Sequence, residues 1–226
     1  MKITYLGQNG LLIESKNSKI IDDPYLSDSV AKIEPENTRR QPVDESFFSV
    51  KPTMVVITHT HADHYDEETL DKLLSGGGCV LFAPPSVFEK AKKRYKNVNC
   101  VFFRSGTSYT AEGIVFRAVK AEHSDTEAVG VIISCEGKDL YITGDTLYSE
   151  QVFESLPENL NCYAVFLPIN GRGNNMNAAD AARFLKRIKY RFAVPMHFGL
   201  FDDLTGCELS CENAVIPEIY KEIMLK

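Results

Sequence analysis

The chain has 226 residues, of which 44% are hydrophobic and 25% are charged, and this composition excludes a disordered tail, a collagen-like fibre or a coiled coil. Its 25 basic and 31 acidic residues give a net charge of −6, which argues against nucleic acid as a main partner, because phosphate binding needs a basic face. No run approaches the ~18 consecutive apolar residues of a membrane span, and no secretory leader is recognisable. We therefore expect residues 1–226 to form a single cytoplasmic domain.

Short apolar runs separated by turn residues predict a sheet at the start of the chain, followed by alternating strands and helices. Residues 27–52 are polar and contain three prolines, so we expect a long loop there. The helix predicted at 66–75 has acidic residues in its first turn and three glycines after its end. The predicted strands of this half are residues 2–7, 10–14, 19–23, 54–59 and 79–84, and the predicted helices are 66–75 and 86–95.

The second half of the chain repeats this alternation. Asn177 is placed to cap a helix, and a two-residue link at Gly137 and Lys138 suits a hairpin. Because neither half can bury its sheet alone, we expect an α/β (α+β) protein whose two sheets pack face to face with helices outside. The predicted strands are 99–104, 114–123, 128–135, 139–145, 162–169 and 192–198, and the predicted helices are 148–156, 178–189 and 212–224.

The six cysteines are scattered along the chain, so we expect reduced, buried thiols rather than disulfides. Cys207 and Cys211 are spaced either as neighbours on one helix face or as a weak metal clip. No second pair of cysteines completes a zinc site with them.

Histidine is concentrated in one short segment. Of the five histidines in the chain, three lie in the run THTHADH at residues 58–64, directly after a predicted apolar strand. In an extended segment alternate side chains share a face, so His59 and His61 point the same way. Asp63 and His64 follow at the start of a turn. Imidazole and carboxylate groups together favour Zn²⁺, with Mn²⁺ or Fe²⁺ as alternatives.

Three further candidate ligands, His123, Asp145 and His197, each lie at the C-terminal end of an apolar run. A single histidine at such a place is most often a surface loop residue. Here all five histidines share that placement, and metal binding explains it better, because histidine is the commonest metal ligand. The set is large enough to bind two adjacent ions.

These residues resemble the signature of the metallo-β-lactamase superfamily of metallohydrolases. Residues 58–64 match its H-x-H-x-D-H motif, and His123, Asp145, His197 and Asp23 match its other motifs. The resemblance covers nearly the whole chain and implies a four-layer αββα sandwich with two divalent metal ions at one sheet edge. It also implies that His59, His61 and His123 bind one ion, that Asp63, His64 and His197 bind the other, that Asp145 bridges both, and that Asp23 steadies the histidine loop.

Within the superfamily, the sequence is similar to the branch that contains L-ascorbate-6-phosphate lactonase. The similarity lies in residues 63–70, 168–182 and 201–203, and it implies an enzyme that opens a lactone or ester of a small molecule, phosphorylated or not. A water that bridges two such ions has its pKa lowered toward roughly 7, so metal-bound hydroxide is available at neutral pH. Asp63 and Asp145 are the candidate catalytic residues, and Asp63 could also hold the proton of the nucleophile.

A polar, glycine-containing loop before the helix predicted at 178–189 supplies four candidate substrate-binding residues. Backbone N–H groups and a guanidinium at such a place can bind an anion, and an ordinary polar connection is the alternative. In the loop at 27–52, Arg39 and Arg40 are better explained as a solvated pair than as a cover for the site. The four candidates are Asn170, Arg172, Asn174 and Asn175.

Other functions are also compatible with the sequence. A phosphodiesterase or a nuclease would use the same ligands, although a nuclease needs a basic groove. A non-catalytic sensor of a metal or nucleotide would keep the site and block its open coordination positions. We expect a small-molecule substrate and no nucleic acid or membrane partner, and the sequence is compatible with a homo-oligomer.

Overall fold

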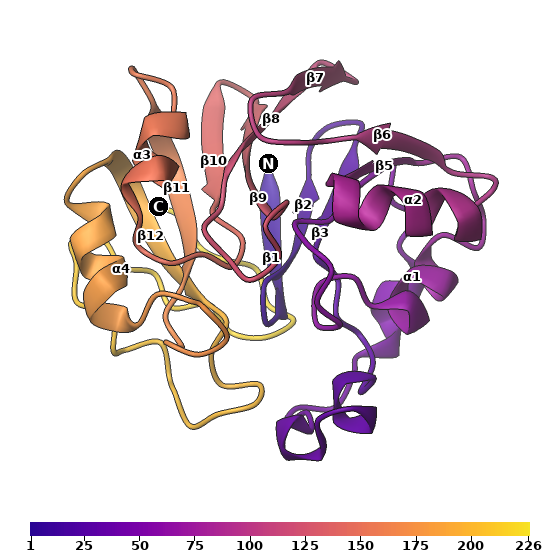
Figure 1. Cartoon of the computed structure of the whole chain (residues 1–226), viewed down its shortest axis with the longest axis horizontal. Coiled ribbons are helices and arrows are strands. Elements are labelled where there is room, and N and C mark those ends of the chain that lie inside the picture. Colours follow the sequence, from indigo (N-terminus) through magenta and orange to yellow (C-terminus); the bar gives the residue numbers. More distant parts are fainter.

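Two six-stranded sheets pack face to face, and helices cover their outer faces, so the chain forms four layers (Figure 1). This computed structural model describes all residues from 1 to 226. The first sheet is covered by α1 (Glu67–Leu73) and α2 (Pro85–Arg94), and the second by α3 (Glu150–Ser155) and α4 (Ala178–Leu185). The expected αββα sandwich is confirmed. None of these helices has the length and apolar character needed to cross a membrane.

The first sheet begins as an antiparallel meander and continues with parallel strands. Parallel neighbours need a crossover connection, and residues 27–52, α1 and α2 supply the three that are required. Residues 27–52 contain only short 3₁₀ helices, η1 (Val30–Lys32), η2 (Pro35–Asn37) and η3 (Glu45–Ser49). The strands, in spatial order, are β1 (Lys2–Gly7), β2 (Gly10–Glu14), β3 (Lys19–Asp22), β4 (Met54–Val56), β5 (Val80–Ala83) and β6 (Asn99–Phe102).

The second sheet has four antiparallel strands followed by two parallel ones. Here α3 and α4 form the crossovers, because each connects two parallel neighbours in the sheet. The strands, again in spatial order, are β7 (Ser108–Ala111), β8 (Ile114–Lys120), β9 (Val129–Cys135), β10 (Lys138–Ile142), β11 (Asn161–Pro168) and β12 (Lys189–Met196).

The main hydrophobic core lies between the two sheets. Met54 and Val56 of β4 face this core, whereas Val55 between them packs on the opposite face under α1 and α2. Strands that are buried on both faces read as continuous apolar runs, which is why they are visible in the sequence. Across the sheet interface, the rings of Phe82 and Phe116 stack with centroids 4.6 Å apart.

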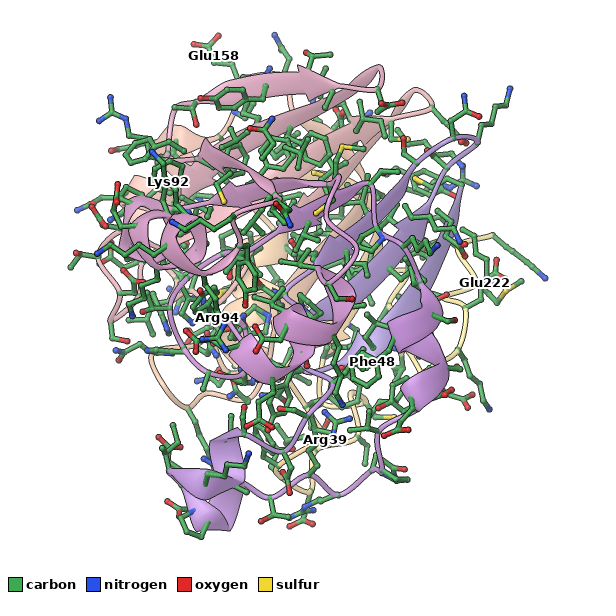
Figure 2. All side chains as sticks on the ribbon, turned by 90° about the vertical axis from the view of Figure 1, so that its right-hand side faces the viewer. Arg39, Phe48, Lys92, Arg94, Glu158 and Glu222 are labelled. Atoms are coloured by element: carbon green, nitrogen blue, oxygen red, sulfur yellow. The ribbon has the colours of Figure 1, made fainter.

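Side chains at the helix ends fix the outer layers. Arg94 lies at the end of α2 (Figure 2). Its Nε and Nη2 atoms lie 2.7 and 2.6 Å from the carboxylate of Asp71 on α1, and this contact joins the two helices. Asn177 caps α4 by accepting a hydrogen bond from the backbone N–H of Asp180 at 2.9 Å, as the sequence predicts.

The prediction of a helix at 212–224 is wrong, because this segment instead forms backbone hydrogen bonds with both sheets. The N–H of Ile223 donates to the carbonyl of Ile3 on β1 at 2.8 Å, and the N–H of Val215 donates to the carbonyl of Ala193 on β12 at 2.8 Å. An edge strand presents unpaired backbone groups, and this segment satisfies part of both edges on one side of the sandwich. Its partners are distant in the sequence, so the local pattern does not reveal them.

Some predicted boundaries also need correction. The strands predicted at 54–59 and 139–145 end at Val56 and Ile142, and β7 lies where no strand is predicted. The β9–β10 hairpin turns at Glu136 and Gly137 rather than at Gly137 and Lys138. Both turn residues have positive φ, 51° and 71°, as the two-residue turn that matches strand twist requires.

The six cysteines form no disulfide. Cys207 and Cys211 lie in an irregular segment rather than on a helix. The prediction that they share a helix face is therefore wrong. Neither residue belongs to a group of side chains that could hold a metal ion.

Truncation of Phe116 tests the packing between the sheets. We expect Phe116→Ala to lower the free energy of unfolding by about 3–5 kcal/mol, because the change leaves a cavity between the two sheets. Urea denaturation followed by circular dichroism measures this. Phe102→Ala is the matched control, since Phe102 is 41% exposed and should lose far less. Equal losses in the two variants would contradict the proposed packing.

Candidate metal centre

The candidate ligands lie in loops that follow the C-terminal ends of strands. His59, His123 and Asp145 each lie three residues after the ends of β4, β8 and β10, and His197 directly follows β12. One of these strands belongs to the first sheet and three to the second. The loops from both sheets therefore meet at one edge of the sandwich.

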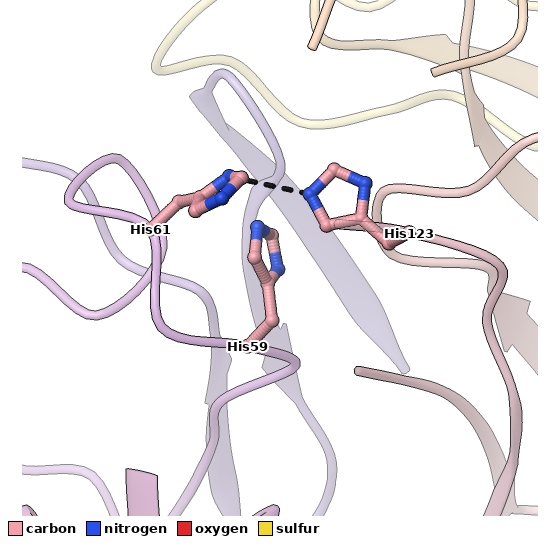
Figure 3. Close-up of side chains that lie close together, drawn as sticks. All are labelled: His59, His61 and His123. Atoms are coloured by element: carbon pink, nitrogen blue, oxygen red, sulfur yellow. Dashed lines mark hydrogen bonds between the residues drawn. The ribbon is translucent and has the colours of Figure 1, made fainter. Parts of the chain in front are cut away.

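Three histidines form the first group of candidate ligands (Figure 3). The ring centroids of His59 lie 4.6 Å from those of both His61 and His123, and the latter two are 4.8 Å apart. The Nδ1 atom of His61 and the Nε2 atom of His123 are 3.2 Å apart. Each ring contributes a nitrogen to one small space, as a metal site with three histidines requires.

Asp63, His64 and His197 form a second group. The Nε2 atom of His197 lies 3.2 Å from a carboxylate oxygen of Asp63 and 3.2 Å from one of Asp145. The other oxygen of Asp145 lies 3.4 Å from Nε2 of His64. The structure thus brings together all seven side chains that the sequence analysis proposes as ligands.

Orphaned polar atoms at this point fit a bound cation. The Nε2 atoms of His59 and His64 and the Oδ1 atom of Asp145 are buried and have no hydrogen-bond partner. Buried polar atoms are almost always satisfied, so three such atoms in one cluster need a partner of another kind. Imidazole nitrogen and carboxylate oxygen are donors suited to divalent transition metals.

The electrostatics of the centre also favour positive charge. Burial lowers the pKa of His59 well below its ordinary value and also lowers the pKa of His123, so both rings are neutral, as metal ligands must be. Burial alone lowers the pKa of His197 as well, but the carboxylates of Asp145 and Asp63 raise it to about 10. Burial alone raises the pKa of Asp145, but His197 and His64 hold it well below its ordinary value. Protons and metal ions therefore compete for the same nitrogen atoms.

The carboxylate of Asp23 lies against the histidine loop. It accepts hydrogen bonds from the backbone N–H of Thr58 at 2.8 Å, from the hydroxyl of Thr58 at 2.5 Å and from the amide of Asn9 at 3.0 Å. It also lies 2.7 Å from Nδ1 of His64. This contact directs the Nε2 atom of His64 toward the centre, since the ring nitrogen that faces a metal is selected by the partner of the other.

Two residues of the β1–β2 turn belong to the centre and were not predicted. The Nε2 atom of Gln8 donates to Asp63 at 2.8 Å, and Asn9 holds Asp23. The sequence signal that could have indicated them is the presence of polar residues in the turn between two otherwise apolar strands. A third unpredicted residue, Asp125, accepts hydrogen bonds from Thr60.

A cavity of about 500 Å³ opens above the candidate ligands. Its floor includes His61, Asp63, Asp145 and His197. One wall comes from the long loop at 27–52, and another comes from residues 170–175. The residues of the two walls are Val30, Ile33, Glu34, Asn37, Asn170, Arg172, Gly173 and Asn175, with Phe201 and Asp202 beside them.

The four candidate substrate-binding residues are placed differently from one another. Arg172 lines the cavity, and its positive charge helps to lower the pKa of the Asp203 carboxyl. Asn170 lines it with an unpartnered side-chain oxygen. Asn175 lines it too, but its amide donates to Asp145 at 2.8 Å, so it holds a candidate ligand. Asn174 does not line the cavity. Its backbone carbonyl lies 3.3 Å from Nδ1 of His123.

Arg39 and Arg40 are paired rather than free. Arg39 donates to the carbonyl of Tyr25 at 2.8 Å and to the hydroxyl of Tyr220 at 2.7 Å, so it anchors the long loop. Arg40 forms an ion pair with Asp203.

The chain is similar to a known protein family and to several metal-dependent hydrolases. The family model described as "Beta-lactamase superfamily domain" matches residues 2–197. A UPF0173 metal-dependent hydrolase of Thermoplasma volcanium is 24% identical over 100% of this chain and 99% of its own length. Igni18, a metallo hydrolase from Ignicoccus hospitalis, has a TM-score of 0.76 at 21% identity, with 98% of this chain and 97% of that chain covered. An isothiocyanate hydrolase from Delia radicum gut bacteria has a TM-score of 0.75 at 18% identity, with 99% and 98% covered.

Substitution of Asp23 tests the support of the centre. We expect Asp23→Asn to weaken Zn²⁺ binding about 10–100-fold, because an amide nitrogen cannot accept the hydrogen bonds that orient Thr58 and His64. Competition with a chromogenic chelator measures the affinity.

Asp22→Asn is the matched control for this variant. Asp22 is buried and its carboxylate makes no hydrogen bond, and burial raises its pKa well above the ordinary value, so asparagine resembles its protonated form. Zinc affinity should stay unchanged in this variant. An equal loss in both variants would contradict the specific role of Asp23.

Proposed function

Since the chain belongs to the beta-lactamase superfamily, we propose that it is a metal-dependent hydrolase that holds two divalent ions and opens an ester or lactone bond in a small molecule. The observation that carries this proposal is the pair of adjacent ligand groups, with Asp145 against the second of them, on the floor of one open cavity. The full-length similarity to a metal-dependent hydrolase supports it.

The ligand set assigns each ion its own residues. His59, His61 and His123 would hold the first ion, and Asp63, His64 and His197 the second, with Asp145 shared between them. Donor sets of imidazole and carboxylate favour Zn²⁺, and Mn²⁺ or Fe²⁺ would also be accepted. When bound, such ions lower the pKa of water toward roughly 7 and polarise the bond under attack.

The side chains of the floor orient the reacting groups. Asp63 lines the cavity and is held on one side by the amide of Gln8, so its carboxylate is positioned to hold a proton of the attacking water. Asp145 is held in turn by Asn175. Groups whose rotamers are fixed by such neighbours lose little freedom when the substrate reacts.

The two walls of the cavity indicate what the substrate carries. The guanidinium of Arg172 is suited to a carboxylate or phosphate, whereas Val30, Ile33 and Phe201 offer apolar contact in the same cavity. Glu34 and Asp202 also line the cavity, and together with the net charge of −6 they disfavour a polyanion. We therefore favour a small substrate with one anionic group over a nucleic acid.

Metal content and a substrate panel test the proposed reaction. The purified chain should bind two ions and hydrolyse lactones or esters faster than a chromogenic phosphodiester. In Asp145→Ala, we expect fewer than two ions per chain and loss of activity, because the shared carboxylate is gone. Elemental analysis and the panel measure both quantities.

Asp139→Ala is the control for Asp145→Ala. The carboxylate of Asp139 accepts from Ser134 at 2.6 Å in the β9–β10 hairpin, away from the ligands, so this variant should keep full metal content. Faster phosphodiester hydrolysis would favour the phosphodiesterase alternative, and full metal content without any turnover would favour the sensor.

Replacement of Arg172 tests the anion-binding wall. We expect Arg172→Ala to raise KM about tenfold for substrates with a carboxylate or phosphate, because a charge-assisted hydrogen bond is lost. Steady-state kinetics on matched anionic and neutral esters measure this. An equal rise in KM for the neutral ester would remove the proposed role.

A further inference from the structure

Asp125 lies in the loop after β8, two residues beyond His123, and joins three separate segments of the chain. We propose that Asp125 is a positioning residue that sets the place of His59 and His61 relative to His123. This inference rests on the proposed metal centre and assigns the side chain that assembles its three-histidine half.

The carboxylate of Asp125 accepts four hydrogen bonds. Its Oδ2 atom accepts from the backbone N–H of Thr60 at 3.1 Å, from the hydroxyl of Thr60 at 2.9 Å and from the hydroxyl of Ser86 at 2.8 Å. Its Oδ1 atom accepts from the backbone N–H of Glu127 at 3.0 Å. Asp125 is absent from the groups that could hold a metal ion, so it acts through its neighbours rather than as a ligand.

The two bonds to Thr60 are the informative ones. Thr60 lies between His59 and His61 in the chain, and bonds to both its N–H and its hydroxyl fix the backbone orientation at this residue. Since Asp125 is itself two residues from His123, one carboxylate connects the two loops whose histidines meet (Figure 3). A backbone bond from the N–H of Val129, the first residue of β9, to the carbonyl of Thr58 at 3.1 Å also connects these parts of the chain.

An ordinary turn does not account for this arrangement. A turn that begins at Asp125 needs only the bond from Glu127, which engages Oδ1. The three donors to Oδ2 come from residues 39 or more positions away in the sequence. Ser86, in the first turn of α2, further ties the contact to the helix layer. The carboxylate therefore holds the loops together, as residues around metal ligands do elsewhere.

Zinc titrations in two single-site backgrounds test this role. His197→Ala removes a ligand of the second group and leaves the three histidines, whereas His123→Ala leaves only the second group intact. We expect Asp125→Asn to weaken zinc binding about tenfold in the His197→Ala background and to leave it unchanged in the His123→Ala background. Chelator competition measures both affinities.

Matched variants separate this effect from a general loss of folding. Thr60→Val keeps the shape and the N–H of Thr60 but lacks its hydroxyl, and should give a smaller loss in the same background. Asp139→Asn neutralises a comparable half-buried carboxylate far from the centre and should change neither affinity. Equal weakening in the two backgrounds, or no weakening in either, would overturn the proposal.

The metal-free protein provides a readout that does not depend on zinc. Nuclear magnetic resonance of the histidine rings should show the signals of His61 and His123 displaced in Asp125→Asn, with those of His197 retained. If the unmodified chain fails to bind two ions, the proposed function fails, and these ring signals still decide the role of Asp125. Unchanged signals of His61 and His123 would overturn that role.

Discussion

The buried carboxylate of Asp23 is the contact on which the candidate metal centre depends. It is fully buried, and its hydrogen bonds reach the β1–β2 turn through Asn9, the histidine loop through Thr58 and a candidate ligand through His64. A polar group can be buried only where such donors compensate for its lost hydration. The loop that carries the H-x-H-x-D-H motif is therefore anchored to the end of β3 before any ligand is considered.

Around Asp23, the centre contains buried imidazoles and carboxylates. Groups of this kind are stable so close together only where opposite charges compensate one another. The neutral imidazole of His59 lies on one side of the centre. On the other side, the carboxylates of Asp145 and Asp63 keep the buried ring of His197 protonated. Their proximity is enforced by the packing of two sheets, whose strands deliver the loops to a shared edge. The rigid core between the sheets thus maintains an arrangement that local interactions alone would not favour, a common property of functional sites.

The cavity above this centre has a different origin. Its walls come from the long loop at 27–52 and from residues 170–175, and neither belongs to a strand of the sandwich. Loops carried on a rigid scaffold commonly determine what an enzyme binds. The candidate ligands on the floor follow strands of the sandwich, whereas these two loops, with Ile33 and Arg172 among their lining residues, supply the walls of the cavity.

The sequence by itself determined most of the architecture and the candidate ligands. Continuous apolar runs specify strands buried on both faces, and imidazoles and acids directly after such runs predict a candidate metal site at their ends. Only the tertiary structure decided that residues 212–224 pair with β1 and β12 instead of forming a helix, and that Gln8, Asn175 and Asp125 support the ligands. The physical reason is that these residues are ordinary polar side chains in loops or turns. What they do depends on partners that are distant in the sequence and become neighbours only when the two sheets pack.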